Sequence, residues 1–193
     1  MTFNTDVQTD RVKMMGGSSS QCLVKSLDVY LETAQIQPLS HNFRHGMRHA
    51  EELSISLGAS LPDLPEAVLR DRYVSVFFEK IHPIYPLFDI DKMKSTIEHF
   101  ASLPSLKSLS HEQGPLLVSA YLILSLGADE RSPRITADGT KYLEAAAGLL
   151  GHVVVMPYLH AVQALLLFTI AYRGRNRDGL GWQTAGMAIR IAF

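Results

Sequence analysis

The chain has 193 residues, of which 47% are apolar, and its formal net charge at pH 7 is −1. This composition excludes a mostly disordered chain, and the length is enough to bury a core without disulfide or metal crosslinks. The near-neutral charge argues against direct DNA contact by this segment, because proteins that grip phosphate backbones are usually clearly basic. The single cysteine, Cys22, provides neither a disulfide framework nor a thiolate zinc site.

The N-terminal third is expected to be loosely organised. The first twenty residues are polar, end in a glycine and serine run, and lack the apolar segment of a secretory signal. Apolar side chains then follow a helical stripe over 21–35, and a second helix is expected over 40–57. The sequence thus divides into three expected regions: a disordered tail over 1–20, a helical linker over 21–64 and a helical domain over 65–193.

The helical domain is expected to open at a proline, since Pro65 suits a first helical turn, with Asp63 as the candidate N-cap. Pro83 and Pro86 end this first helix, and His82–Phe88 is expected to be an extended connector. Gly127 is the expected C-cap of a buried helix. The later helices are expected over 89–101, 114–126, 136–150, 158–172 and 182–193.

No strand-like alternation stands out, so the sequence predicts an all-α fold, an irregular bundle of about seven helices. The last helix reaches Phe193 without a cap, and the bundle is therefore expected to be incomplete at its C-terminus. The apolar stretch 149–172 contains glycine, proline and histidine, so we interpret it as a turn and a buried helix rather than a membrane span.

Three histidines form the sharpest chemical pattern in the chain. His41, His45 and His49 are spaced to lie on one helix face, where two histidines four residues apart can share a metal ion. All three cannot bind one ion, because His41 and His49 lie about 12 Å apart along a helix axis. The other interpretation is a polar helix face together with Arg44 and Arg48.

The remaining polar groups have ordinary explanations. The sequence contains neither a nucleophile elbow nor a glycine-rich phosphate loop, and we expect no catalytic, cofactor-binding or metal-binding residue. Residues 129–131 are expected to form a solvated loop. Arg173, Arg175 and Arg177 are expected to form a surface turn, a local positive patch that can meet a phosphate or carboxylate partner. Trp182, the only tryptophan, is expected to pack as a core anchor.

Five short motifs occur in order along the chain. An aromatic helix leads into His-Pro, an aromatic residue, proline and an apolar residue; there follow Leu-Gly-Ala, a helix with Tyr, Ala and Leu, a Val-Gln-Ala-Leu-Leu-Leu run, and a tryptophan before Gly-x-Ala-Ile-Arg-x-Ala. Over about residues 66–193 this order resembles the fungal-specific transcription factor domain, the middle homology region of fungal zinc-cluster transcription factors. The motif positions that we single out are His82, Pro83, Tyr85, Pro86, Gly127, Gln163, Gly186 and Arg190.

The resemblance implies a regulatory domain of a nuclear transcription factor that modulates transcription and is not an enzyme. The family's six-cysteine zinc cluster is absent here, so zinc and DNA contact are expected only through a missing N-terminal cluster, with no cofactor in this chain. A small-molecule effector or a protein partner is implied. The expected effector pocket is lined by Tyr73, Phe77, Tyr121, Phe168 and Trp182. The alternatives are a helical metal-dependent enzyme that uses the histidine face, and a pure protein-interaction module.

Overall fold

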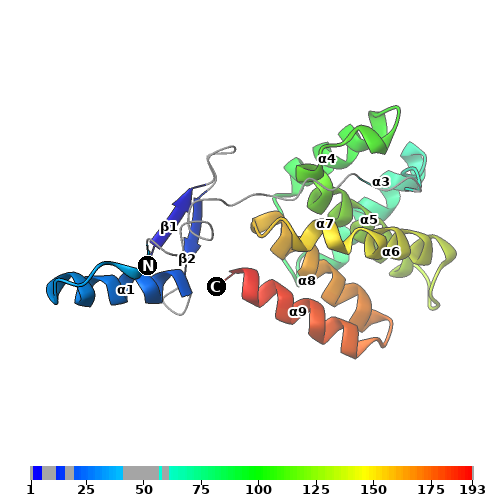
Figure 1. Cartoon of the computed structure of the whole chain (residues 1–193). Coiled ribbons are helices and arrows are strands. Elements are labelled where there is room, and N and C mark those ends of the chain that lie inside the picture. The colour runs from blue at the N-terminus through cyan, green and yellow to red at the C-terminus, as the bar shows by residue number, and fades with distance from the viewer. Residues whose placement is uncertain (1, 6–11, 16–19, 41–56, 58–60, 193) are drawn as a thin grey trace. The chain divides into compact units, whose positions relative to one another are not determined.

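The computed structural model describes residues 2–5, 12–15, 20–40, 57 and 61–192. The chain divides into two compact units, Met1–Leu53 and Ser54–Phe193, and each is described by itself. Figure 1 shows the elements of both units along the chain. None of the described helices is long and apolar enough to span a bilayer.

The described residues of the first unit form two paired strands and one helix. Strands β1 (Thr2–Thr5) and β2 (Val12–Met15) pair antiparallel in a segment where the sequence predicts a flexible tail. Strands of four residues are too short for the alternation of side chains to stand out in the sequence. Helix α1 (Ser20–Thr33) forms where a helix is expected over 21–35. The second expected helix, with His41, His45 and His49, lies outside the described residues.

The described residues of the second unit form helices and turns, which confirms the predicted all-α class. With α1 included, the described residues contain eight α-helices, close to the expected number of about seven. In chain order the elements are α3 (Ala67–Val76), a π-helical turn η2 (Phe77–Ile81), α4 (Ile90–Ser102), the 3-10 helices η3 (Leu106–Ser108) and η4 (His111–Gln113), α5 (Gly114–Asp129), α6 (Ala137–Gly148), α7 (Leu150–Val154), α8 (Leu159–Gly174) and α9 (Asp178–Ala192).

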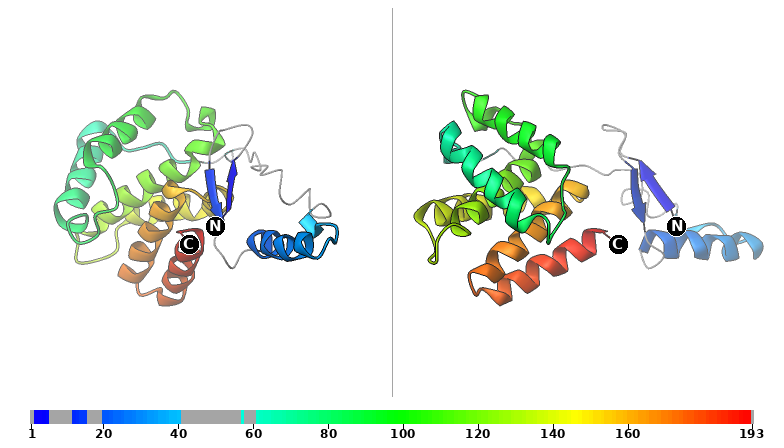
Figure 2. Two further views of the ribbon diagram at one scale, coloured as in Figure 1. Left: turned by 90° about the vertical axis from the view of Figure 1, so that its left-hand side faces the viewer. Right: turned by 180° about the vertical axis from the view of Figure 1, so that it is seen from behind.

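Helix α5 is the centre of this unit. It is apolar on all sides, and α3, α4, α6, α7 and α8 pack around it, as the views of Figure 2 also show. Helix α9 packs against α8. Burial of apolar side chains from every helix around α5 builds one continuous core, and it is this core that fixes the remaining helices.

The predicted starts of α4 and α5 are confirmed, and the predicted start of α3 is wrong. The Asp89 carboxylate accepts a hydrogen bond from the backbone N–H of Lys92 at 3.1 Å and caps α4. Pro115 lies in the first turn of α5. Asp63, by contrast, is not the cap of α3, because that helix begins at Ala67 after Glu66.

Two predicted boundaries also need correction. Gly127 is not a C-cap but lies inside α5, which continues to Asp129. A Cβ atom at Gly127 would overlap the backbone carbonyl of Tyr73, so this glycine permits α3 and α5 to cross closely. The helix expected over 136–150 ends at Gly148, where Leu149 leaves the helical conformation and α7 follows.

Candidate functional site

Four of the five predicted pocket residues lie in the core. Tyr73, Phe77, Tyr121 and Phe168 are buried. Tyr73 donates a hydrogen bond to the Asp138 carboxylate at 2.7 Å. Burial raises the pKa of Tyr73 to about 12, and the hydrogen bond to Asp138 adds to this shift. The phenol is therefore a hydrogen-bond donor at physiological pH.

The rings of Tyr121 and Phe168 contact different residues and do not line a common cavity among the described hollows. Tyr121 donates a hydrogen bond to the Pro62 carbonyl at 2.6 Å and stacks on Tyr142, with 6.0 Å between ring centroids. Phe168 stacks on Tyr172. Burial raises the pKa of Tyr121 above its ordinary value. These rings fill the core, and the two hollows described below are lined by other residues.

Trp182 is 82% exposed, so the prediction of a core anchor is wrong. Helix α9, which begins at Asp178, one turn before the predicted start, packs against α8 through a stripe of small residues that does not include Trp182. Gly181, Thr184 and Ala188 are buried on this stripe. The Thr184 hydroxyl lies 2.9 Å from that of Thr169 on α8. Small side chains allow close approach of the two helices, and the large indole lies outside their contact.

The His-Pro motif forms a closed turn rather than the extended connector that we expected. The buried ring of His82 places Nε2 3.2 Å from the Phe88 backbone N–H and 3.1 Å from the Phe88 carbonyl. The Leu87 carbonyl accepts a hydrogen bond from Nε2 of Gln163 on α8 at 2.5 Å. Two motif residues that are 81 positions apart, His82 and Gln163, thus hold the same turn in place.

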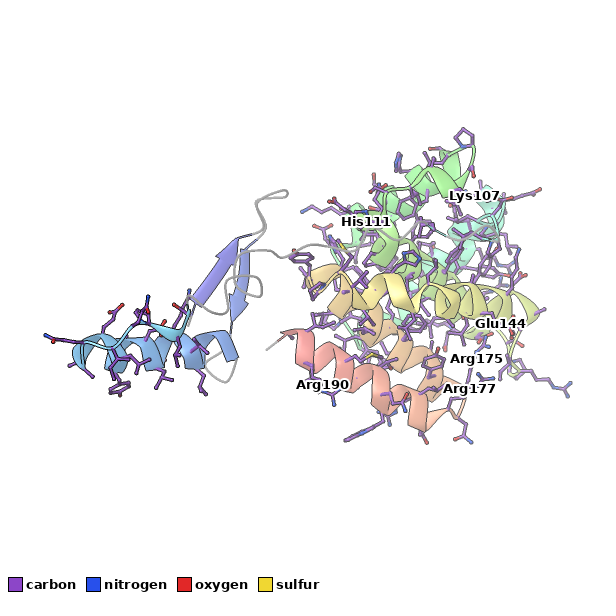
Figure 3. All side chains as sticks on the ribbon, viewed as in Figure 1. Lys107, His111, Glu144, Arg175, Arg177 and Arg190 are labelled. Atoms are coloured by element: carbon purple, nitrogen blue, oxygen red, sulfur yellow. The ribbon has the colours of Figure 1, made fainter. Side chains whose placement is uncertain are left out.

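The other motif residues lie around this turn or on other helices. Pro83, Tyr85 and Pro86 belong to the turn itself, and the Tyr85 side chain is exposed. Gly186 and Arg190 lie on α9, and Figure 3 shows Arg190 toward the end of that helix distant from Arg177. The structure therefore gathers the His82–Phe88 turn and Gln163 at one place and leaves the α9 positions apart from it.

An ion pair between an almost buried arginine and a carboxylate that is 22% exposed corrects two further predictions. Nε and Nη2 of Arg175 donate to one carboxylate oxygen of Asp129 at 3.0 and 2.7 Å, and only 8% of the Arg175 side chain is exposed. The second carboxylate oxygen accepts hydrogen bonds from the backbone N–H and hydroxyl of Thr136. Asp129 is therefore not part of a solvated loop, and Arg175 is not part of a surface patch, although Arg173 and Arg177 are exposed.

This cluster joins three helices at one end of the unit. Asp129 ends α5, Thr136 caps α6, and Arg175 lies in the turn between α8 and α9, where Figure 3 labels it beside Arg177. Nη1 of Arg175 also donates to the Thr140 hydroxyl at 3.2 Å. Sequence reasoning missed the pair because its members are 46 positions apart, and only their shared placement at helix ends is visible in the sequence.

A hollow of about 230 Å³ lies between α3 and α4, and we call it the α3–α4 hollow. The buried side chains of Val74 and Ile97 give it an apolar base. Nε of Arg70 is buried and has no hydrogen-bond partner among the described residues. Its full lining is Arg70, Asp71, Val74, Ser75, Lys94, Ile97 and Glu98.

A second hollow of about 380 Å³ shares Arg70 with the first. It lies beside the segment before α3 and the end of α4, with Glu66 and Phe100 in its lining. Sequence reasoning missed both hollows. The signal was present, because Arg70 and Val74 share one face of α3 while Lys94, Ile97 and Glu98 share one face of α4, but nothing in the sequence says that these two faces meet.

The metal hypothesis is not tested by the described residues. His41, His45 and His49 lie outside them. Within the part of the chain that is described, no group of three or more His, Cys, Asp or Glu side chains is arranged to hold a metal ion.

Comparison with known proteins gives one match. The family description "Fungal specific transcription factor domain" matches residues 74–193, which is more than half of the chain. No curated protein and no solved structure matches the chain. The matched range includes the His82–Phe88 turn, Gly127, Gln163 and all of α9.

Proposed function

The chain belongs to the family of the fungal specific transcription factor domain, and on this premise we propose that it modulates transcription through a change in helix packing when an effector or a partner binds. The observation that carries the proposal is the family match over 74–193. The net charge of −1 supports a regulatory part rather than a DNA-contacting part. We further propose that the domain acts in the nucleus and that a separate zinc-cluster domain contacts DNA.

The contacts of α9 support a mechanism. This helix packs against α8 through small side chains, and the turn that joins the two helices contains Arg175, whose partners lie on α5 and α6. A ligand that binds one arrangement of α8 and α9 more tightly than another shifts the population toward that arrangement. The partly buried ion pair would relay such a change to α5 and α6, because the donors of Arg175 bind Asp129 at the end of α5 and Thr140 on α6.

A reporter assay tests this function. The chain is inserted between a heterologous DNA-binding domain and an activation domain, and reporter transcription is measured in fungal cells. A regulatory domain is expected to lower the output of the fusion, and a variant that unfolds the bundle is expected to restore it. Equal output from fusions with and without the chain contradicts the proposal.

The two alternatives give different results. A pure interaction module captures its partners in a pull-down whether or not small metabolites are present, and leaves the reporter unchanged in cells that lack the partner. A metal-dependent enzyme that uses the histidine face contains stoichiometric zinc or iron after purification, which metal analysis of the purified chain detects.

A further inference from the structure

The α3–α4 hollow combines cationic groups with an apolar base. Arg70 and Lys94 both line it, one from each helix. The nearest carboxylate to Arg70 is that of Asp71, at 3.7 Å from Nε. Nζ of Lys94 lies 5.7 Å from the centre of the Phe78 ring, and no carboxylate of the described residues pairs with it.

Arg70 lines the hollow with a side chain that is 15% exposed. Its Nε is buried and has no hydrogen-bond acceptor among the described residues, since the Asp71 carboxylate lies 3.7 Å away, so the guanidinium is not fully paired within the protein. A guanidinium presents its donors in a rigid fork that matches a carboxylate, and a neighbouring ammonium adds a second positive charge. We propose that the α3–α4 hollow binds the carboxylate of a small organic acid through Arg70 and Lys94, with the apolar part of the ligand against Val74 and Ile97.

The charge of the lining selects the type of anion. Arg70 and Lys94 are balanced by Asp71 and Glu98, so the lining is neutral overall. A neutral lining gives a multiply charged phosphate little net Coulomb energy to offset its large cost of leaving water, whereas a singly charged carboxylate has a smaller cost to offset. The volume of about 230 Å³ lies below the range of roughly 300–1,000 Å³ for drug-sized ligands, which favours a small metabolite.

This site supplies an effector position for the regulatory function proposed above, and in that respect the inference rests on it. Helix α3 packs against α5 at Gly127, and α4 contacts α5 as well. A ligand that bridges Arg70 on α3 and Lys94 on α4 therefore stabilises one placement of these two helices on the central helix.

Matched probes test the site on the full chain. Sodium pentanoate, pentanamide and inorganic phosphate are titrated while the methyl signals of Val74 and Ile97 are followed by NMR. Pentanoate is expected to shift these signals with saturation. Pentanamide, which has the same apolar body without the charge, and phosphate are expected to give no saturable shift. Absence of a pentanoate shift, or equal shifts with pentanamide, overturns the proposal.

Two variants with matched controls locate the binding groups. Arg70→Gln and Lys94→Gln are each expected to weaken pentanoate binding about tenfold or more, because each removes a charge-assisted hydrogen bond. The controls are Arg72→Gln, on the same helix outside the lining, and Lys141→Gln, whose ammonium lies over Tyr142 as that of Lys94 lies over Phe78. Unchanged binding in Lys94→Gln overturns the proposal even if Arg70→Gln fails to fold.

The outcomes of the binding test and of the reporter test are independent of each other. A chain that lowers reporter output but does not bind pentanoate refutes only the site. A chain that binds pentanoate through Arg70 but leaves the reporter unchanged supports the site and refutes the regulatory role.

Discussion

Arg175 and Asp129, 46 positions apart, meet in a partly buried ion pair in which two guanidinium N–H groups converge on one carboxylate oxygen. The pair joins the end of α5 to the turn between α8 and α9. Its second carboxylate oxygen accepts hydrogen bonds from the backbone N–H and hydroxyl of Thr136, so the carboxylate is held from two sides. A movement of the turn after α8 relative to α5 and α6 would therefore disturb the contacts of Arg175 with Asp129 and Thr140.

Removal of the arginine is expected to destabilise the unit. Arg175→Leu removes two charge-assisted hydrogen bonds from a carboxylate that is 22% exposed and still accepts from Thr136, at a cost of about 1–3 kcal/mol. Urea denaturation followed by circular dichroism measures the free energy of unfolding. The control is Arg177→Leu at an exposed position of the same turn, expected to change it by less than about 0.5 kcal/mol. Similar losses in both variants would show that the pair contributes little.

A methyl group at the crossing of α3 and α5 is also expected to destabilise the unit. Gly127→Ala places a Cβ atom on the Tyr73 carbonyl, so the helices must separate, at a cost of about 1–3 kcal/mol. Gly148→Ala at the end of α6 is the matched control, because no atom lies within 4 Å of a Cβ at that position. It is expected to raise stability by about 0.4–1 kcal/mol through the entropy of the unfolded chain. Thermal melts of both variants decide the sign, and a stabilised Gly127→Ala protein contradicts the close crossing.

Loss of the Gln163 amide is expected to loosen the His82–Phe88 turn. Gln163→Leu removes the donor to the Leu87 carbonyl and costs about 1 kcal/mol. Hydrogen exchange of the Phe88 amide, which lies beside Nε2 of His82, is expected to become faster. His160→Ala is the control, since His160 contacts the other end of the Gln163 amide from an exposed position. Unchanged exchange in Gln163→Leu contradicts a clamp formed by both residues.

Local rules succeeded where neighbouring residues decide the structure. The cap at Asp89, the proline at the start of α5 and the ends set by Pro83 all depend on contacts within a few residues. The all-α class follows from the same spacing of apolar residues. Such features can be predicted because their physical cause lies inside the segment that shows them.

Features that depend on distant partners could not be predicted. Gly127 has the sequence context of a C-cap, but its cause is Tyr73 on another helix. A tryptophan such as Trp182 is expected in the core because its side chain is large and apolar, yet the small residues near it make the contact with α8. Arg175 lies between two exposed arginines and differs from them only through Asp129. The α3–α4 hollow was missed for the same reason, since two ordinary helix faces become a site only when they meet.

His152 is expected to make the helical unit less stable in mild acid. Burial lowers the pKa of His152 below its ordinary value of 6.5, and the nearby His111 lowers it further. Between that lowered pKa and 6.5 the unfolded chain binds the proton and the folded chain does not, so stability rises with pH in this window. The stabilisation is complete above 6.5 and is lost as the pH falls toward the pKa of the folded state. Urea denaturation at pH 7.5, 6.5 and 5.5 measures the trend.

A pair of variants assigns this trend to one side chain. His152→Leu replaces the imidazole, whose Nδ1 has no hydrogen-bond partner among the described residues, by an apolar side chain. It is expected to flatten the pH dependence of the unfolding free energy between pH 7.5 and 5.5. His160→Leu, at an exposed position, is the control for the substitution itself. The expectation depends only on a proton that His152 binds in the unfolded chain and not in the folded one. If the unfolding free energy of His152→Leu still falls with decreasing pH as in the parent chain, other titrating groups cause the acid sensitivity.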